Sequence, residues 1–432
     1  MTSPDSADHP TARARALAKA GDYEGAGRVI AELVRAAFGL AAKTATINRD
    51  QYSLNSLNGI VAIGDGSEYF FKFHQEEGEG DTVAEYYRAE TLREAGYPVD
   101  VPAFASREVG RQILLYRRRH DRRFADLCRA AELDGTIDTA PLIRAQEDLD
   151  RIIGERYLAT LHGATADEAA AEPVHRLFHA RLVDPDRPER LGGRAARFYL
   201  DQPFEFPGLT AHWRDIGHRC WRINGVEYQG TLAGLFEESR RILAPANFAG
   251  AAVVAHGDAH NANVWCEDAQ SAAPRLVFFD PAFAGSHVPA LLAEIKATFH
   301  NIFAHPFWLY DARLAAEKYR AAIRLRGEVL EVEHDWQLSD LRTAFLDSKF
   351  RQVWRPLLTE LKSRGMLPAN WRRIIRCALF CCPTLVMNQR AGAGDHNPIS
   401  SAIGLSVAVM AGSEPATGRD VLSAMLDDLN PR

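Results

Sequence analysis

The sequence lacks a long apolar segment. None of the apolar runs in its 432 residues approaches the ~20 residues that a membrane-spanning helix needs, and the N-terminus has no apolar core of a secretory signal. The six cysteines lack the spacing of metal ligands combined with histidine and do not form the pattern of a secreted disulfide-rich domain. We therefore expect reduced cysteines, no membrane partner and a cytoplasmic location.

The sequence also lacks an excess of basic residues. Its net charge is −6, which gives no indication of binding to nucleic acid or to an anionic membrane. Apolar residues make up 47% of the chain, a fraction typical of a globular protein. A chain of this length usually divides into two or more folding units.

A glycine-rich phosphate loop is missing as well. The polar segment Gln51 to Asn58 lies between two expected strands, at 44–47 and 59–63, and contains no glycine. Its backbone N–H groups could still bind phosphate, with help from the hydroxyls of Ser53 and Ser56. An ordinary polar hairpin turn explains the segment equally well.

What is present is a polar loop between two apolar, strand-like runs. It reads His256-Gly257-Asp258-Ala259-His260-Asn261-Ala262-Asn263, and the next strand ends in Asp280. Asp258, Asn263 and Asp280 offer a base and two oxygen ligands for Mg²⁺, the groups that phosphoryl transfer from ATP requires. The spacing from Asp258 to Asn263 equals that of the kinase catalytic-loop signature.

Two other readings of this loop stay open at this point. A structural turn could carry Asp and Asn because both tolerate turn geometry, although that accounts for only one or two of the polar residues. A metallohydrolase could use His256, Asp258 and His260, which alternate and could face one metal.

A lysine upstream favours the kinase interpretation. Residues 68–73 form an aromatic strand that contains Lys72, and residues 82–95 are expected to form a helix with Glu85 in its first turn. Kinases use such a pair to hold the α- and β-phosphates. The alternatives are a surface lysine, and a glutamate that only favours the positive end of the helix.

Several motifs, in order along the chain, resemble the aminoglycoside phosphotransferase and choline-kinase-like family. His256-Gly257-Asp258 with Asn263 matches its H-G-D-x-x-x-x-N loop, Asp280 matches its later metal-binding Asp, and Leu158 to His162 resembles its L-A-x-L-H helix end. The segment from Glu85 to Pro102 is similar to a further family motif, with an insertion of Val99-Asp100.

The resemblance implies an α+β, protein-kinase-like fold with two lobes, a small β-rich N-lobe and a larger, mainly helical C-lobe. The expected divisions are a helical extension over residues 1–38, the N-lobe over 39–117 and the C-lobe over 118–432. The strand at 112–116 should end at the hinge that contacts the adenine, which makes Leu115 and Arg117 candidate nucleotide-binding residues with Lys72, Glu85, Ser53 and Ser56. Arg117 begins a basic run through Arg123 that is more typical of a solvated surface.

The resemblance implies that Asp258 is the catalytic base and that Asn263 and Asp280 hold Mg²⁺. A second acid that many family members carry after the metal-binding Asp is absent, so the number of metal ions stays open. The later Asp that braces the catalytic loop is also missing, and Glu294 is a candidate replacement.

We therefore expect a small-molecule kinase that transfers the γ-phosphoryl group of ATP to a hydroxyl of a sugar, nucleoside, antibiotic or related metabolite. The alternatives are a non-catalytic nucleotide-binding protein of the same fold and the metallohydrolase. For the acceptor pocket the sequence offers Glu294, His287, His300, Trp221, Phe299 and Trp308. This mixture suits a polyhydroxylated ligand better than a polycationic aminoglycoside.

Overall fold

A computed structural model describes residues 9–48, 56–74, 88–304 and 306–429. The chain forms two compact units, one of Met1–Asp121 with Val277–Ala282 and the other of Arg122–Leu276 with Phe283–Arg432. The first unit is built on one antiparallel sheet, and the second is mainly helical with several small sheets. The expected α+β class is confirmed.

The first unit contains a five-stranded sheet in the order β1-β2-β3-β5-β4. Its strands are β1 (Ala42–Ile47), β2 (Ser56–Ile63), β3 (Glu68–His74), β4 (Phe104–Ser106) and β5 (Ile113–Arg117). Lys72 lies in β3 opposite Asn58 of β2 and Leu114 of β5. The strands expected around 44–47, 59–63, 68–73 and 112–116 are therefore confirmed.

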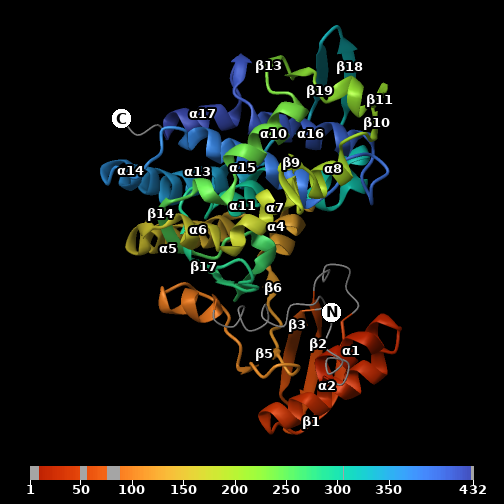
Figure 1. Ribbon diagram of the computed structural model, residues 1–432, viewed down its shortest axis with the longest axis vertical. Helices are drawn as coiled ribbons and strands as arrows, with labels where there is room; N and C mark the ends of the chain where they lie inside the picture. Colours follow the sequence, from red (N-terminus) through yellow and green to blue (C-terminus); the bar gives the residue numbers. More distant parts are fainter. Residues whose placement is uncertain (1–8, 49–55, 75–87, 305, 430–432) are drawn as a thin grey trace. The chain divides into compact units, whose positions relative to one another are not determined.

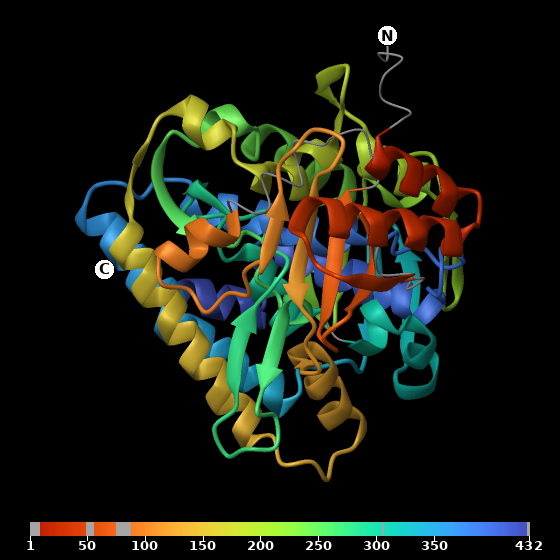
Figure 2. The same ribbon diagram turned by 90° about the horizontal axis from the view of Figure 1, so that it is seen from below.

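Two helices, α1 (Pro10–Lys19) and α2 (Tyr23–Phe38), precede the sheet, as the sequence predicts. Asp22 caps α2 by accepting a hydrogen bond from the backbone N–H of Gly25 at 2.8 Å. Helix α2 ends at Gly39, whose φ of 67° suits glycine. Its apolar face packs on the sheet, and α1 packs on α2, so that both helices cross the strands in Figure 2.

The chain returns to the first unit at Val277–Ala282. Phe278 donates its N–H to the carbonyl of Pro98 at 2.7 Å, and its own carbonyl accepts the N–H of Asp100 at 2.8 Å. This short parallel pairing attaches a segment from late in the sequence to the first unit. Asp280 therefore belongs to the same unit as Lys72.

The second unit contains fourteen α-helices among the described residues, together with short 3₁₀ and π segments. The α-helices are α4 (Phe124–Leu133), α5 (Ala140–Thr160), α6 (Ala166–Ala170), α7 (His179–Leu182), α8 (Gly193–Phe198), α9 (Trp213–Ile216), α10 (Leu232–Ile242), α11 (Ile295–Thr298), α12 (Ala315–Lys318), α13 (Asp340–Lys349), α14 (Arg355–Ser363), α15 (Trp371–Val386), α16 (Pro398–Gly412) and α17 (Val421–Asp428). The 3₁₀ segments are η2 (Pro173–Leu177), η3 (Pro245–Asn247), η4 (Asn261–Asn263) and η7 (Ala312–Leu314), and the π segments are η5 (Phe299–Phe303), η6 (Pro306–Tyr310) and η8 (Phe350–Trp354).

Short strands complete this unit and form the sheets β17-β14-β7, β16-β15-β6, β18-β19-β12-β13-β20, β10-β11 and β8-β9. Their bounds are β6 (Arg122–Arg123), β7 (His162–Ala164), β8 (Val183–Asp184), β9 (Arg187–Leu191), β10 (Pro203–Phe206), β11 (Leu209–His212), β12 (Cys220–Ile223), β13 (Val226–Tyr228), β14 (Gly250–Ala255), β15 (Val264–Glu267), β16 (Arg275–Phe278), β17 (Gly285–Pro289), β18 (Ala321–Arg326), β19 (Val329–His334) and β20 (Pro415–Thr417).

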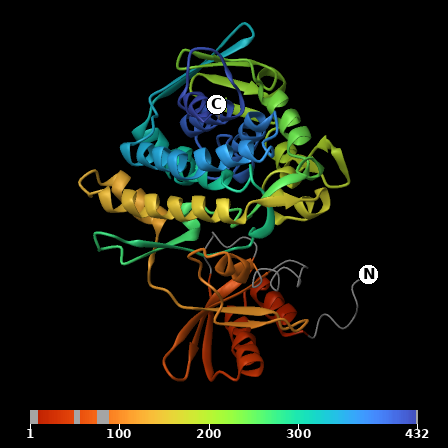
Figure 3. The ribbon, with the colours of Figure 1, turned by 90° about the vertical axis from the view of Figure 1, so that its left-hand side faces the viewer.

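Within this unit, the five-stranded sheet lies at one end and β14 and β17 at the other, with α15 and α16 between them (Figure 1). Helix α5 runs beneath the C-terminal helices and packs on α13, η8 and α14 (Figure 3). Helix α15 is almost wholly buried and carries Cys377, Cys381 and Cys382, which are free thiols as expected. In the described part of the chain, no helix has the length and apolar character needed to cross a membrane.

The Asn224-Gly225 pair between alternating apolar residues predicts a type I′ hairpin, and the structure confirms it. It joins β12 to β13, and both turn residues have positive φ, 47° and 85°. These values are typical of a type I′ turn. The side-chain oxygen of Asn224 also accepts the N–H of His334 at 2.9 Å, which ties the turn to the end of β19.

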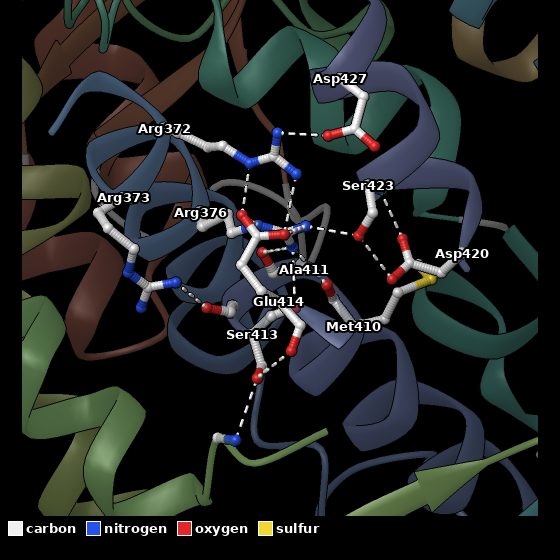
Figure 4. A network of polar contacts seen from close by, with 12 residues as sticks. Arg372, Arg373, Arg376, Met410, Ala411, Ser413, Glu414, Asp420, Ser423 and Asp427 are labelled. Atoms are coloured by element: carbon white, nitrogen blue, oxygen red, sulfur yellow. Dashed lines mark hydrogen bonds and ion pairs between the residues drawn. The ribbon is translucent and has the colours of Figure 1, made fainter. Parts of the chain in front are cut away.

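A buried arginine joins the last helices of the chain (Figure 4). Arg376 of α15 is 0% exposed and donates to carbonyl oxygens at the end of α16, including those of Met410 at 3.0 Å and Ser413 at 2.9 Å. Its charge is paired with Glu414 at 2.7 Å, and Ser423 of α17 accepts a further bond. Arg376 therefore satisfies the free carbonyls of one helix while it holds another.

Glu414→Gln is expected to lower the free energy of unfolding by about 2 kcal/mol at pH 7, because it leaves Arg376 buried without its counter-ion. Burial raises the pKa of Glu414, but hydrogen bonds from Arg372 and Arg376 outweigh it and lower the pKa to about 2. A depressed carboxylate pKa stabilises the fold above the unfolded value and ceases to do so as pH falls through the folded value. In urea unfolding, the difference in the free energy of unfolding between Glu414→Gln and wild type should therefore shrink below about pH 4.5.

Asp428→Asn, which changes an exposed carboxylate of α17, is the control and should alter stability by no more than about 0.5 kcal/mol. Equal stability of Glu414→Gln and wild type at pH 7 would contradict this account of the network.

Candidate functional site

The loop between β14 and β15 is held by its own hydrogen bonds. The carbonyl of Asp258 accepts the N–H of His260 at 2.9 Å and the side-chain amide of Asn263 at 3.0 Å. The N–H of Asn263 donates to the carbonyl of His260 at 2.7 Å. These bonds use the amide nitrogen of Asn263 and leave its side-chain oxygen available as a ligand.

The turn at Gly257 requires glycine. Its φ is 74°, and a Cβ at this position would overlap the carbonyl oxygen of Phe283. His256 before it is 2% exposed, and its Nδ1 accepts the N–H of Asp258 at 3.4 Å. His256 thus braces the loop through the backbone of Asp258.

A second brace comes from Asn301 in the π segment η5, whose side-chain oxygen accepts the N–H of Asn261 at 2.8 Å. The prediction that Glu294 replaces the bracing acid is wrong. Glu294 is 0% exposed, accepts the hydroxyl of Tyr157 at 2.7 Å and forms an ion pair with Lys349. Because these contacts occupy its carboxylate, Glu294 is also unavailable to an acceptor pocket.

The carboxylate of Asp258 lies among positive charges. Its Oδ1 is buried and accepts no hydrogen bond from any described residue, but Nε2 of His260 lies 3.7 Å away and Nζ of Lys296 lies 3.9 Å away. Burial raises the pKa of Asp258, and the charges of His260, Lys296, His256 and Arg181 outweigh it, so that the pKa falls below its ordinary value. The group is an ionised base at neutral pH.

A series of buried polar side chains in contact with one another extends from Asp258 through Lys296. This lysine of α11 is 4% exposed and donates from Nζ to Nε2 of His300 at 2.8 Å. Burial, together with Lys296 and His260, holds the pKa of His300 well below its usual range. His300 is therefore neutral, and its Nδ1 contacts the hydroxyl of Tyr310.

In the first unit, Lys72 lies against Asp280. Nζ of Lys72 and Oδ1 of Asp280 are 2.6 Å apart, and the lysine side chain is 12% exposed. Asp280 has a φ of 56°, a left-handed conformation that Asp tolerates better than most residues. Two residues later, the carbonyl of Ala282 accepts a bond from Arg88 at 2.8 Å, which secures the segment that carries Asp280.

The remaining nucleotide-binding candidates are placed only in part. Ser53 and Glu85 lie outside the described residues, and Ser56 is the first residue of β2. Leu115 is buried in the middle of β5, where its backbone pairs with both neighbouring strands. Arg117 is exposed at the end of β5. Their roles toward a nucleotide stay predictions.

The residues expected to hold Mg²⁺ are suited to it by chemistry. The amide oxygen of Asn263 and the carboxylate of Asp280 are hard oxygen donors, and Mg²⁺ is usually held by few protein ligands together with phosphates and water. Among the described residues no group of three or more His, Cys, Asp or Glu side chains could hold a metal. This finding gives the metallohydrolase alternative no support.

Two residues near Asp258 were missed by sequence reasoning. Lys296 lies between the apolar residues Ile295 and Ala297 in a segment that is more than half apolar, from Leu291 to Phe303. A lysine there was a usable signal, since buried lysines are rarely without a partner. Arg181 of α7 also lowers the pKa of Asp258. The residues around Arg181 in the sequence gave no comparable indication of this role.

Of the residues proposed for an acceptor pocket, the structure places only His300 beside the charges around Asp258. Trp221 is fully buried in β12, within the five-stranded sheet at the other end of the unit (Figure 1). Trp308 is buried against Trp336. His287 donates its N–H to Glu172 at 2.6 Å and contacts His162.

Among solved structures, the chain is similar to a spectinomycin phosphotransferase in complex with ADP and spectinomycin (12% identity, 89% of this chain and 97% of that chain covered, TM-score 0.40). It is also similar to a proposed fructosamine-3-kinase from Thermobifida fusca (14%, 89% and 98%, 0.41) and to a macrolide 2'-phosphotransferase from Brachybacterium faecium (12%, 83% and 89%, 0.37). No protein-family model and no curated protein sequence matches the chain. The functional argument therefore depends on the residues described above.

Gly257→Ala is expected to destabilise the protein by about 1–3 kcal/mol, because alanine is strained at this φ and collides with the Phe283 carbonyl. Gly163→Ala is a matched control in the adjoining strand β7, where a Cβ meets nothing within 4 Å. Chemical unfolding of both variants checks the difference. Equal stability of the two would show that the loop does not need glycine at position 257.

Proposed function

We propose that the chain is a small-molecule kinase that transfers the γ-phosphoryl group of ATP to a hydroxyl group. The observation that carries the proposal is the Asp258 carboxylate, an ionised base with an unbonded oxygen on a loop fixed by His256, Asn263 and Asn301. A purely structural aspartate in such a buried position would be expected to accept hydrogen bonds.

In this reaction the acceptor oxygen attacks the γ-phosphorus, the bond to the β-phosphate oxygen breaks, and ADP leaves. The acceptor proton passes to the carboxylate of Asp258 as the new P–O bond forms. The depressed pKa of Asp258 keeps this carboxylate ionised at neutral pH. The fixed loop limits the positions that the carboxylate can take, which favours a productive alignment.

The nucleotide would be bound by Lys72, whose ammonium group already contacts a carboxylate in the first unit. Asn263 and Asp280 are the residues that would hold Mg²⁺. Bound Mg²⁺ would supply neutralisation of the negative charge that develops on the phosphates. A non-catalytic nucleotide-binding role would not need an ionised base beside Lys296, so we favour the enzyme.

Asp258→Asn should lower kcat by about 10²-fold or more, because general-base contributions are of that order. The amide keeps the shape of the side chain, so ATP binding should persist in calorimetry. Asp186→Asn, at an exposed turn, is the control and should be as active as wild type. Transfer at the wild-type rate by Asp258→Asn would contradict the assignment of the base.

Asp280→Ala tests the nucleotide-binding half separately. It removes a ligand proposed for Mg²⁺ and the partner of Lys72, so binding of Mg-ATP should be lost while the fold remains stable in thermal melts. Asp121→Ala, which changes a half-buried acid of the same unit paired with Arg119 at 3.3 Å, controls for removal of an ion pair. Normal Mg-ATP affinity in Asp280→Ala would show that the metal ligand is misassigned.

A further inference from the structure

The base Asp258 is surrounded by more positive charge than its own carboxylate can offset. Three basic residues contribute, Arg181 of α7, Arg194 of α8 and Lys296 of α11. The charge of each shifts the pKa of another of the three or of Asp258. The elements that carry them are in contact, since α7 packs on α8, α8 packs on α15, and α15 packs on α11 (Figure 1). Three basic side chains thus gather in this part of the second unit.

Arg181 is half-buried, and none of the described residues forms an ion pair with it. Within the described part of the chain its guanidinium makes no hydrogen bond and no salt bridge, although five N–H donors are available. Its unpartnered nitrogens are not fully shielded, so solvent can reach them. Burial, and next the charge of Arg194, lowers the pKa of Arg181 to about 10. An accessible arginine in this state is available to bind an anion.

Arg194 does not offset this charge, because the acceptors that it contacts among the described residues are neutral. Its Nη1 donates to the carbonyl oxygens of Leu385 at 2.9 Å and Val386 at 3.3 Å, at the end of α15. These bonds fix the guanidinium but leave its positive charge uncompensated. Arg194 therefore adds to the positive potential around Arg181.

Nearby acids are engaged elsewhere. Glu294 pairs with the buried Lys349, and Glu172 accepts the backbone N–H of His287. Among the carboxylates, Asp258 raises the pKa values of Arg181 and Lys296 most strongly. Buried or half-buried cations are normally paired, so the unit presents an incomplete charge balance that a bound anion would complete.

We propose that the acceptor is a small hydroxylated molecule that carries an anionic group, a carboxylate or a phosphate, which Arg181 binds beside Asp258 in the positive potential of Lys296 and Arg194. This inference rests on the proposed kinase function and adds the charge class of its substrate. A polycationic acceptor would meet repulsion from the three cations. A neutral polyol would leave Arg181 without its partner.

The same cations could instead act on the transferred phosphate, and the two roles predict different kinetics. A residue that binds the acceptor anion changes KM for anionic acceptors and leaves neutral ones and KM for ATP unaffected. A residue that stabilises the transferred phosphate lowers kcat for every acceptor alike. Acceptors matched in shape but not in charge separate these roles.

The first experiment uses wild-type protein, Mg-ATP and a panel of hydroxylated metabolites in matched sets. Gluconate is compared with glucitol, glycerol 3-phosphate and glycerate with glycerol, and nucleoside monophosphates with nucleosides, while kanamycin represents polycations. The best acceptor should be anionic, with kcat/KM at least about tenfold above its neutral match, since hydrogen bonds to charged groups are of that order. The carboxylate and phosphate sets show which anion is bound. A neutral or polycationic best acceptor would overturn the proposal.

The second experiment changes the cations. Arg181→Gln should raise KM for the best anionic acceptor about tenfold or more, by the same reasoning, with kcat and KM for ATP within a factor of two to three. Arg190→Gln, at an arginine of β9 that is 63% exposed, is the control and should resemble wild type. Arg181→Lys keeps the charge and should recover part of the affinity. An equal loss with neutral acceptors would assign Arg181 to the transferred phosphate and overturn the proposal.

Failure of the kinase function itself gives a different result. If calorimetry detects no Mg-ATP binding and none of the charge classes is phosphorylated, the proposed reaction is wrong. If transfer occurs without preference for anions, the reaction stands and only the charge class of the acceptor is wrong.

Discussion

The placement of a carboxylate among buried and half-buried cations is the constraint on which the second unit depends. Burial alone would raise the pKa of Asp258, and the charges of His260, Lys296, His256 and Arg181 outweigh it and lower the pKa. Lys296 and Arg181 come from separate elements, and the packing of α7, α8, α11 and α15 is what brings them together. The loop bonds to His256 and Asn301 then fix where the carboxylate lies. The charge state of Asp258 therefore depends on the packing of these helices.

The acid that pairs with Lys72 in the first unit comes from a distant part of the sequence. Lys72 and Asp280 are separated by 208 positions and meet because residues 277–282 return to pair beside Pro98 and Asp100. A lysine held by a carboxylate is a strong, charge-assisted contact, and its partial shielding makes it stronger than a surface pair. In the kinase function that we propose, rearrangement of this pair would free the lysine for phosphate and the carboxylate for a cation.

Local patterns carried most of what could be predicted from the sequence. Four of the five strands of the first sheet, the Asn224-Gly225 turn and the free cysteines follow from alternation, turn chemistry and cysteine spacing, and the structure confirms them. The tertiary neighbours of Asp258 could not be predicted in this way. Arg181 and Lys296 become neighbours only through helix packing, and the loop brace proved to be Asn301, because Glu294 is bound by Lys349. The β18 and β19 hairpin, in a region expected to be mostly helical, likewise depends on pairing with β12.

The most direct test of the account is the chemical fate of the γ-phosphate. ³¹P nuclear magnetic resonance can follow wild-type protein incubated with Mg-ATP and a mixture of hydroxylated carboxylates and phosphate esters. The account predicts that the γ-phosphate signal decays as ADP signals and a new phosphate-monoester signal grow in equal amounts. Conversion of ATP only to ADP and inorganic phosphate, or an unchanged ATP spectrum with every mixture, would contradict it.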